Sequence, residues 1–354
     1  MKVVIVGASG NIGSALVREL ASSDHPDHEI VGVARRIPEV TPQAEHLASV
    51  RWESADIATS DLDAVVSGAD VVVHLAWLFQ PSHDPDLTWR ANAVGTQRLL
   101  DAAARQGVGA IIVNSSIAAY SPGNGSRVDE SWPTDGPSSA AYAREKVYVE
   151  RLLDIFELKH PETRVVRIRP AFVFQRSAAT SQRRLFAGPL LPGRLLDPKL
   201  IPVLPVPRGL QMQAVHSADL ARALAAAVER PVLGAFNITA DDVLDRDALA
   251  EVFSAKAMNI SPGIVRHALG AAWRLHLVPA PANLFDALMR LPVMSADRAR
   301  AELDWVPQHS GREALEAFLQ GVRHAAGSTM PPLDPKSSGP LRSKEFKTGI
   351  GSKP

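Results

Sequence analysis

Hydrophobic residues in the first half of the chain alternate between short continuous runs and longer, regularly spaced patterns. The short runs are rich in Val and Ile and predict buried strands at Lys2–Val6, Glu29–Ala34, Val71–Ala76, Ala110–Ser115 and Arg164–Ile168. The longer stretches repeat apolar residues at three- and four-residue steps and predict helices at Asn11–Ser22, Pro85–Gln106 and Ser139–His160. Strands that alternate with crossover helices indicate an α/β fold with a doubly wound parallel sheet.

The pattern changes after Pro170. The segment Arg176–Gly209 is rich in Pro, Gly and Arg without a sustained period, so we interpret it as a lid or substrate loop. A helix is expected again at Ser217–Glu229 and a strand at Ala235–Thr239. Several further helical stretches follow between Arg246 and Ala326.

These changes divide the chain into three parts. Residues 1–175 are expected to form the main α/β domain, to which residues 212–240 return. Residues 176–211 and 241–327 are expected to form a smaller, mostly helical C-terminal lobe for the substrate. Residues 328–354 contain Pro, Gly, Ser and Lys with few apolar anchors, and we expect them to be a disordered tail.

Composition narrows the possible partners. The 354 residues carry 38 basic and 38 acidic side chains, which gives no electrostatic reason to expect a nucleic acid or an anionic membrane as partner. A small-molecule substrate fits better. The absence of cysteine excludes disulfides and thiolate chemistry, and no spaced His/carboxylate cluster suggests a metal. The apolar start Val3–Val6 is too short for a signal peptide, so a cytoplasmic location is expected.

A glycine pattern follows the first predicted strand and opens the first helix. Gly7 permits a tight turn, Gly10 allows the backbone to approach a diphosphate, and Gly13 allows close packing of helix and strand. Asn11 and Ile12 lie in the first turn of that helix, where backbone N–H groups face an anion. The pattern predicts a Rossmann domain that binds NAD or NADP, and the alternative is a glycine-rich turn without a ligand.

The end of the second predicted strand bears on the choice between the two dinucleotides. The chain reads Ala34-Arg35-Arg36 where a carboxylate would otherwise hold the adenosine ribose. Guanidinium groups there can bind a 2′-phosphate, so NADP(H) is favoured and NAD(H) is the alternative. The two arginines are also compatible with solvated surface positions.

Tyr142 and Lys146 lie one turn apart on the predicted helix Ser139–His160. A phenol is a weak acid–base group at neutral pH, and a nearby ammonium lowers its pKa toward the working range. Ser116 follows the strand Ala110–Ser115 at the carboxyl edge of the sheet, where its hydroxyl can bind a substrate oxygen. A Tyr and a Lys at this spacing also occur by chance on solvated helices, but Ser116 beside them favours a catalytic set.

These features together resemble the extended short-chain dehydrogenase/reductase family, also described as the NAD-dependent epimerase/dehydratase family. The resemblance covers about the first 325 residues. Besides the glycine loop it rests on further segments, namely Asp56-Ile57, His74-Leu75-Ala76, Asn92 to Thr96, Ser116, Tyr142 with Lys146, Arg169-Pro170 and Val215 to Leu220.

The resemblance implies roles for these residues. Tyr142 would be the acid–base group, Ser116 would orient the substrate oxygen, and Lys146 would lower the pKa of Tyr142 and bind the nicotinamide ribose. Further cofactor contacts are implied for Asp56 and Ile57 at the adenine edge, for Pro170 and Asn92 near the nicotinamide, and for Leu75, Ala76 and Ser115. His74 and His216 are interpreted instead as hydrogen-bonded structural residues.

Departures from the family pattern narrow the expected chemistry. Ile117 and Ala118 follow Ser116 where sugar-nucleotide dehydratases carry an Asp-Glu pair. Phe172 and Met212 occupy positions that hold an Asn and an Arg in members that grip a nucleotide-sugar diphosphate. The surrounding apolar residues suggest an apolar pocket, although each could equally fill the core, and they are Phe172, Phe174, Leu190, Leu191, Leu210 and Trp273 or Phe285.

The leading functional hypothesis from the sequence is therefore an NADPH-dependent oxidoreductase of a ketone or aldehyde, or the reverse dehydrogenase, on a small apolar substrate. A sugar-nucleotide 4-epimerase that holds NAD is the alternative, and a non-catalytic dinucleotide sensor is a third. A homodimer formed through the helices Pro85–Gln106 and Ser139–His160 is expected from the resemblance.

Overall fold

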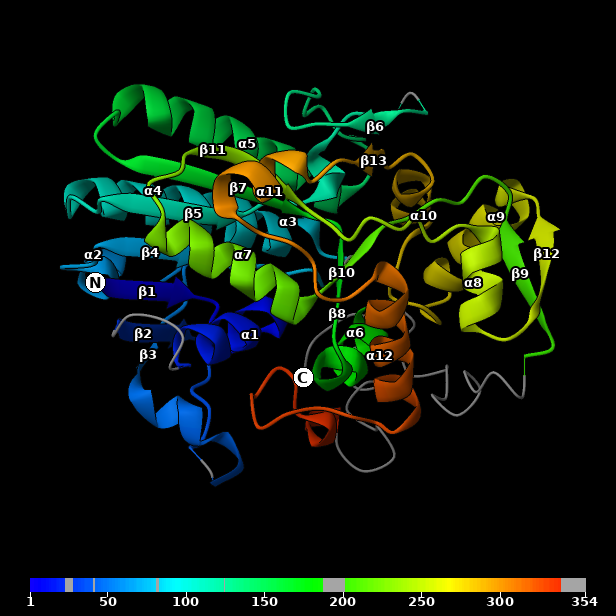
Figure 1. The fold of residues 1–354 in the computed structure, drawn as a ribbon, viewed down its shortest axis with the longest axis horizontal. Coiled ribbons are helices and arrows are strands. Elements are labelled where there is room, and N and C mark those ends of the chain that lie inside the picture. The colour runs from blue at the N-terminus through cyan, green and yellow to red at the C-terminus, as the bar shows by residue number, and fades with distance from the viewer. Residues whose placement is uncertain (23–27, 41, 81–82, 124, 187–200, 339–354) are drawn as a thin grey trace.

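A computed structural model describes residues 1–22, 28–40, 42–80, 83–123, 125–186 and 201–338 of the chain. At its centre lies a seven-stranded parallel sheet with the order β11-β7-β5-β4-β1-β2-β3 (Figure 1). The strand order reverses beside β1, which is where open α/β sheets bind ligands at the carboxyl ends of their strands. The strands are β1 (Lys2–Val6), β2 (Glu29–Ala34), β3 (Val50–Ser54), β4 (Val71–His74), β5 (Ala110–Asn114), β7 (Arg164–Pro170) and β11 (Gly234–Ile238).

Helices cover both faces of this sheet, and successive strand residues point to opposite cores. Val3 and Ile5 pack with α1 (Asn11–Leu20) and α7 (Ser217–Glu229) on one face. Val4 and Val6 pack with residues of three helices on the other face, which are α2 (Leu62–Val66), α4 (Gly95–Arg105) and α5 (Ala141–Lys159). The sheet is therefore buried on both sides, as its continuous apolar runs predicted.

One helix of the second face is irregular. The predicted helix Pro85–Gln106 consists of α3 (Pro85–Trp89), a π-helical turn at Arg90–Val94 and α4. A π turn inside a helix adds a residue and is frequent at functional sites. Here it contains Asn92, which is fully buried.

The second lobe is built from short strand pairs and helices. β8 (Phe172–Phe174) pairs with β10 (Ala214–His216), and β9 (Val203–Pro207) pairs with β12 (Lys256–Ile260). β6 (Arg127–Val128) pairs with β13 (Val293–Met294). The helices are α6 (Ala179–Phe186), α8 (Arg246–Val252), α9 (Pro262–Arg274), α10 (Ala282–Leu288), α11 (Asp297–Leu303), which packs back on the sheet domain, and α12 (Gly311–Arg323). Short 3-10 turns lie at Pro42–Ser49, Ile117–Ala119, Arg176–Ala178 and Pro335–Ser338.

The predicted parallel α/β sheet is confirmed, and two local expectations need revision. Strand β3 was not predicted, because its sequence Val50–Ser54 is polar and half-exposed at the edge of the sheet. The expected loop Arg176–Gly209 contains α6 and β9. Residues 187–200 of that segment lie outside the described residues.

The expectation of a disordered tail from Ser328 is wrong for its described part. Met330 and Leu333 are 3% and 2% exposed and belong to the same hydrophobic core as α1 and α7. Burial of these two apolar side chains offsets the conformational entropy that is lost when the segment becomes ordered. The polar composition of the segment had led us to expect that this entropy would keep it disordered. Residues 339–354 lie outside the described residues.

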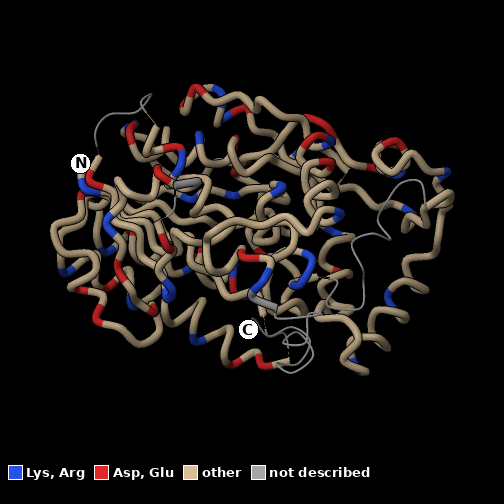
Figure 2. Tube along the Cα trace, turned by 90° about the horizontal axis from the view of Figure 1, so that it is seen from below, with Lys and Arg blue, Asp and Glu red and all other residues tan. Residues whose placement is uncertain are grey.

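The outer surface adds two observations. Acidic and basic positions are interspersed along the backbone in Figure 2. In the described part of the chain, no helix is long and apolar enough to cross a bilayer. Pairing of the helices 85–106 and 139–160 with a second copy of the chain stays a prediction; on α5 the apolar side chains of Ile155 and Leu158 are 50% and 85% exposed.

Candidate active site

A cavity of about 600 Å³ opens at the carboxyl ends of the sheet strands, between the sheet domain and the second lobe. This volume falls in the range that holds small organic ligands and cofactors. All residues to which the sequence assigned catalysis or cofactor binding line it, namely Gly7, Gly10, Asn11, Ile12, Gly13, Arg35, Arg36, Asp56, Ile57, Leu75, Ala76, Asn92, Ser115, Ser116, Tyr142, Lys146 and Pro170. The fold therefore brings together positions that span most of the first half of the sequence.

The glycine loop leaves no room for side chains. Gly7 has a φ of +94°, and a Cβ there would lie 2.6 Å from the backbone nitrogen of Ala76. A Cβ on Gly13 would lie 2.3 Å from the carbonyl oxygen of Gly7. Helix α1 begins after Gly10 without a side-chain cap, so its first N–H groups are available to an anion. This cradle fits the diphosphate of a dinucleotide.

Arg35 and Asp56 line the cavity at one end and face each other. Their side chains are 59% and 38% exposed, and Arg35 Nη1 lies 4.0 Å from Asp56 Oδ2. An ion pair this long and exposed contributes little to stability. Arg35 is therefore free to turn toward a ligand, and Arg36 beside it is also exposed and lines the cavity.

Ser116 and Tyr142 meet at the opposite end of the cavity. Ser116 is 6% exposed, and its Oγ accepts a hydrogen bond of 3.1 Å from the backbone of Ala118 at the start of a 3-10 turn. Burial raises the pKa of the Tyr142 phenol, and a hydrogen bond with Ser116 partly opposes this shift. The phenol is therefore protonated at neutral pH in this state.

Lys146 lies deeper than Tyr142 on the same face of α5. Its Nζ donates a hydrogen bond of 2.7 Å to the carbonyl oxygen of Asn114 and lies 3.4 Å from the centroid of the Trp77 ring. Burial lowers the pKa of Lys146 to about 7, against the opposing charges of Glu150 and Glu145.

The sequence suggested that Lys146 lowers the pKa of Tyr142, and the structure differs on this point. The pKa of Tyr142 is raised, and Lys146 Nζ lies 5.9 Å from the centroid of the Tyr142 ring. Both groups are desolvated, and burial, not the charge of Lys146, sets the direction of the shift at the phenol.

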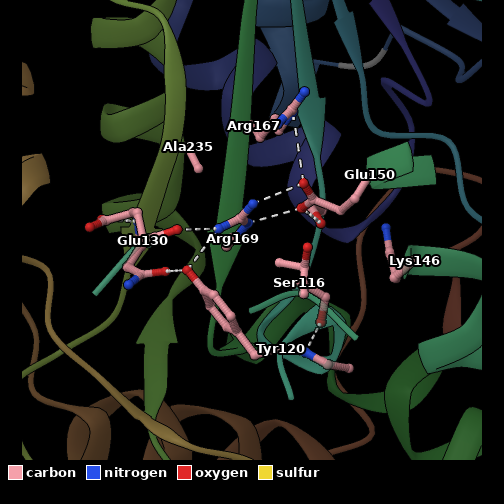
Figure 3. Close-up of polar contacts among 12 residues, drawn as sticks. Ser116, Tyr120, Glu130, Lys146, Glu150, Arg167, Arg169 and Ala235 are labelled. Carbon is pink, nitrogen blue, oxygen red and sulfur yellow. Dashed lines mark hydrogen bonds and ion pairs between the residues drawn. The ribbon is translucent and has the colours of Figure 1, made fainter. Parts of the chain in front are cut away.

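A buried ion pair connects α5 to the sheet beside these residues. Glu150, one turn beyond Lys146, accepts hydrogen bonds from Arg169 Nε and Nη2, both of 2.9 Å, and from Ser115 Oγ at 2.6 Å. Burial would raise the pKa of Glu150, but the hydrogen bond and charge of Arg169 hold it below its usual value. Figure 3 shows the Arg169 guanidinium between Glu150 on one side and Tyr120 and Glu130 on the other.

A second buried carboxylate, Glu145, has no counterpart in the residues singled out from the sequence. It accepts hydrogen bonds from Thr88 Oγ1 at 2.7 Å and Asn92 Nδ2 at 2.6 Å. Asn92 also bonds to both backbone groups of Leu78, at 2.7 and 2.8 Å. Asn92 therefore holds the loop after β4, and it brings Trp77 over Lys146. The sequence pattern did not select Glu145 or Trp77. The signal that could have found them is their position in the sequence, next to Lys146 and Ala76.

The wall of the cavity that the second lobe forms is apolar, and it includes part of the apolar set expected from the sequence. Phe172, Phe174 and Phe285 line the cavity, together with Leu284 and Leu288. Trp273 lines a neighbouring cavity of about 380 Å³ on the other side of Tyr142.

Other residues of the expected apolar pocket lie elsewhere. Leu210 packs instead against a separate core of the second lobe, which Met212 also contacts. Leu190 and Leu191 fall outside the described residues. The two histidines are hydrogen-bonded as interpreted, His74 to Thr96 Oγ1 at 2.8 Å and His216 to the backbone of Ala218 at 3.3 Å. Burial lowers the pKa of His74 to about 3, which keeps it neutral. Among the described residues, no group of three potential ligands could hold a metal.

A family model, similar sequences and a similar structure match large parts of the chain. A model of the NAD dependent epimerase/dehydratase family matches residues 3–239. An uncharacterised protein of Mycobacterium tuberculosis is 27% identical over 330 residues, which cover 92% of this chain and 31% of the relative. The chain thus spans about a third of the length of that relative.

Two further proteins are similar over different extents. The N-acetyl-alpha-D-glucosaminyl-diphospho-ditrans,octacis-undecaprenol 4-epimerase of Escherichia coli is 30% identical over 174 residues, or 49% of each chain. The structure of a UDP-glucose-4-epimerase from Stenotrophomonas maltophila, with bound NAD and formylated UDP-arabinopyranose, has a TM-score of 0.68 and 18% identity. It covers 92% of this chain and 98% of that one, and at this identity it shows the fold alone.

Replacement of Lys146 by Met should change how stability depends on pH. The pKa of Lys146 is about 7 in the folded protein and near 10.5 when unfolded, so between these values the unfolded chain holds the extra proton. The free energy of unfolding contributed by this residue therefore rises with pH across the window and is lowest at its acid end. Urea unfolding at intervals across the window should show a steeper rise for wild type than for Lys146→Met. Lys159→Met, at the exposed end of α5, is the control, and parallel curves for Lys146→Met would contradict the burial of a titrating amine.

Glu150→Gln should destabilise the fold strongly. The change leaves Arg169 charged and buried without its partner, and breaking a buried pair typically costs about 3–5 kcal/mol. Glu157→Gln, on the same helix, is the matched control, because Glu157 is 36% exposed and its partner Arg167 keeps a second carboxylate, Asp154, at 3.0 Å. That variant should lose less than about 1 kcal/mol. Similar losses in the two variants, measured by urea unfolding, would mean that Glu150 has no special role.

Proposed function

This chain belongs to the NAD dependent epimerase/dehydratase family, and we propose that it oxidises and reduces one carbon–oxygen group of a sugar joined through a diphosphate to a carrier, as 4-epimerases do. The observation that carries the proposal is the arrangement of Ser116, Tyr142 and Lys146 at the end of the same cavity that the glycine loop lines. Similarity to a 4-epimerase favours this reaction over the ketone reduction that we preferred from the sequence.

Residues along the cavity would bind successive parts of the dinucleotide. The uncapped N-terminus of α1 and the glycine loop would hold the diphosphate, and Asp56 and Ile57 would contact the adenine. Lys146 would bond the nicotinamide ribose, with Pro170 close by. When bound, the dinucleotide supplies the acceptor and donor of a hydride at this end of the cavity.

Ser116 and Tyr142 would handle the proton. Ser116 Oγ orients the substrate oxygen, and Tyr142 exchanges a proton with it. In oxidation Tyr142 would take the hydroxyl proton of the substrate, and in the reverse reduction it would return the proton to the same oxygen. The dinucleotide would supply the acceptor and then the donor of the hydride, and inversion of the carbon requires the two transfers to occur on opposite faces. Tyr142 must start this sequence deprotonated, and the hydrogen bond with Ser116, which lowers the pKa of the phenol, favours that state.

The apolar wall of the cavity favours one kind of carrier for the sugar diphosphate over another. Phe172 lines the cavity where sugar-nucleotide members of the family carry an Asn, and Leu284, Leu288 and Phe285 extend the same wall. The similar 4-epimerase acts, by its name, on a sugar diphosphate of undecaprenol, whose carrier is apolar. A polyprenyl carrier therefore suits this wall better than a nucleotide does.

Reduction of a ketone or aldehyde on an apolar substrate is the second candidate, because the same wall suits it. The dehydratase reaction lacks its acidic pair, since Ile117 and Ala118 follow Ser116. A dinucleotide sensor would have no use for a buried Ser116, Tyr142 and Lys146 set.

Product analysis distinguishes the first two candidates. An epimerase converts a sugar diphosphate, free or carrier-linked, to its C4 epimer, visible by NMR, without net consumption of NAD(P)H. A reductase consumes NAD(P)H in proportion to the ketone or aldehyde supplied, visible by nicotinamide absorbance.

Tyr142→Phe should abolish turnover while it changes cofactor affinity by no more than a few-fold. The variant keeps the ring but loses the hydroxyl that transfers the proton, and it removes no group assigned to the dinucleotide. Turnover is measured with whichever substrate the product analysis identifies, and NAD(P)H affinity by fluorescence titration. Activity within tenfold of wild type would rule out the role given to Tyr142.

We also expect at least fivefold tighter binding of NADP(H) than of NAD(H). A 2′-phosphate carries close to two negative charges, and a charge-assisted bond to Arg35 or Arg36 contributes about 1.5–3 kcal/mol before exposure and salt weaken it. Arg35→Ala with Arg36→Ala should remove most of the preference and leave NAD affinity nearly unchanged. Titration of the wild type with both dinucleotides is the decisive measurement, and equal affinities would make the two arginines ordinary surface residues.

A further inference from the structure

The C-terminal segment Gly327–Ser338 folds into a closed turn against the sheet domain. Ser328 N donates a hydrogen bond of 3.2 Å to Leu333 O, and Leu333 N donates one of 2.8 Å to Met330 O. A Cβ on Gly327 would lie 2.3 Å from Leu333 O, so the backbone approach requires glycine. Met330 and Leu333 insert into the core formed by residues such as Ala8 and Leu16. The segment is therefore a built part of the fold, seen at the red end of the ribbon in Figure 1.

Side chains of α6 hold this segment from the other side. Arg184 Nη2 donates hydrogen bonds of 2.9 Å to Asp334 O and 3.2 Å to Pro335 O. Just before the segment, Ala326 O accepts a hydrogen bond of 2.7 Å from Thr180 Oγ1. These bonds fix the main chain of the segment relative to α6.

The same region is bonded to the glycine loop. Gln175 Nε2 donates to Asn11 O at 2.8 Å and to Asn11 Oδ1 at 2.7 Å. Asn11 Nδ2 and Gln182 Nε2 both donate to Val173 O, at 3.3 and 2.7 Å. A continuous set of contacts thus runs from the first turn of α1, through β8 and α6, to the C-terminal segment.

Two residues of the segment reach the cavity itself. Pro332 and Leu333 line it together with Ser9 and Gly10 of the glycine loop and Gln182 of α6. Met330 is equally buried but does not line the cavity. The Leu333 side chain therefore borders both the hydrophobic core and the cavity, whereas Met330 borders only the hydrophobic core.

We propose that the C-terminal segment Gly327–Ser338 is a wall of the dinucleotide site and slows release of the bound dinucleotide. The proposal rests on the proposed function only in that a dinucleotide binds along the glycine loop. Pro332 and Leu333 would contact the dinucleotide through apolar surface and exclude water from the side of the cavity formed by Ser9 and Gly10. Slow release suits an epimerase, which returns the hydride within one turnover, better than a reductase, which must exchange its cofactor each time.

The experiment compares Leu333→Ala with Met330→Ala. Each variant removes a large side chain from the same core, so both should lower the melting temperature to a similar extent. Only Leu333→Ala also removes a wall of the cavity. Stopped-flow fluorescence measures the release of NADPH after mixing with excess NADP⁺, and the same is done with NADH and NAD⁺. We expect at least fivefold faster release from Leu333→Ala and a change below twofold for Met330→Ala.

Equal release rates in wild type and Leu333→Ala would overturn the proposal, as would equal acceleration in the two variants, which would indicate general loosening. Pro332→Asp covers the case in which Leu333→Ala does not fold, because Pro332 is only half-buried. Its added carboxylate should raise the dissociation constant of NADPH at least fivefold at low salt, with an unchanged melting temperature, and an unchanged dissociation constant would overturn the proposal.

A wild-type protein that binds neither dinucleotide would overturn both this proposal and the proposed function. One that binds but has no epimerase or reductase activity would overturn only the latter.

Discussion

The buried pair of Glu150 and Arg169 is the interaction on which the site depends. Glu150 lies on α5 and Arg169 on β7, and their two hydrogen bonds of 2.9 Å fix the position of the helix along the sheet. Tyr142, Lys146 and Glu150 follow one another at four-residue steps, so they share one face of that helix. Glu150 also accepts a hydrogen bond from Ser115, the residue before Ser116. A single buried carboxylate thereby sets the distance between the hydroxyl on the sheet and the phenol and amine on the helix.

The same burial that makes this pair strong controls the acid–base groups near it. In a desolvated site the neutral forms of Tyr142 and Lys146 are both favoured, which raises the pKa of one and lowers that of the other. The Trp77 ring offsets part of the cost of charge on Lys146, since its face lies 3.4 Å from Nζ. At neutral pH Tyr142 therefore keeps its proton, whereas Lys146, with a pKa of about 7, is the group that titrates there. Anything that brings negative charge near Lys146, a substrate or a cofactor phosphate included, shifts that balance toward the ammonium.

Enclosure of the cavity comes from segments that are remote in sequence. The sheet domain supplies the glycine loop and the Ser116 turn, α10 supplies Leu284 and Leu288, and the C-terminal segment supplies Pro332 and Leu333. Hydrogen bonds of Gln175 and Gln182 join the first turn of α1 to β8 and α6 through Asn11 and Val173, and Arg184 of α6 is in turn bonded to the C-terminal segment. Because the wall formed by the second lobe is apolar, it offers water few hydrogen-bond partners, and a bound ligand that covers it would place the polar groups at the catalytic end in a low-dielectric environment.

The sequence by itself determined the sheet, its buried strands and the residues at its carboxyl edge, because those depend on local periodicity and on glycines whose backbone has no room for a side chain. It placed Gly7, Ser116 and Tyr142 at one cavity although more than a hundred residues separate the first two. The sequence could not reveal β3, because the polar residues of this strand show no pattern of burial. Nor could it reveal the docking of Met330 and Leu333, because two apolar residues in a polar segment predict burial only if the rest of the fold offers a hydrophobic core to receive them. The pKa of Tyr142 was also misjudged, because spacing along a helix gives the neighbours of a group but not its desolvation. Only tertiary packing decides how much water each group loses, and that quantity set the electrostatics of this site.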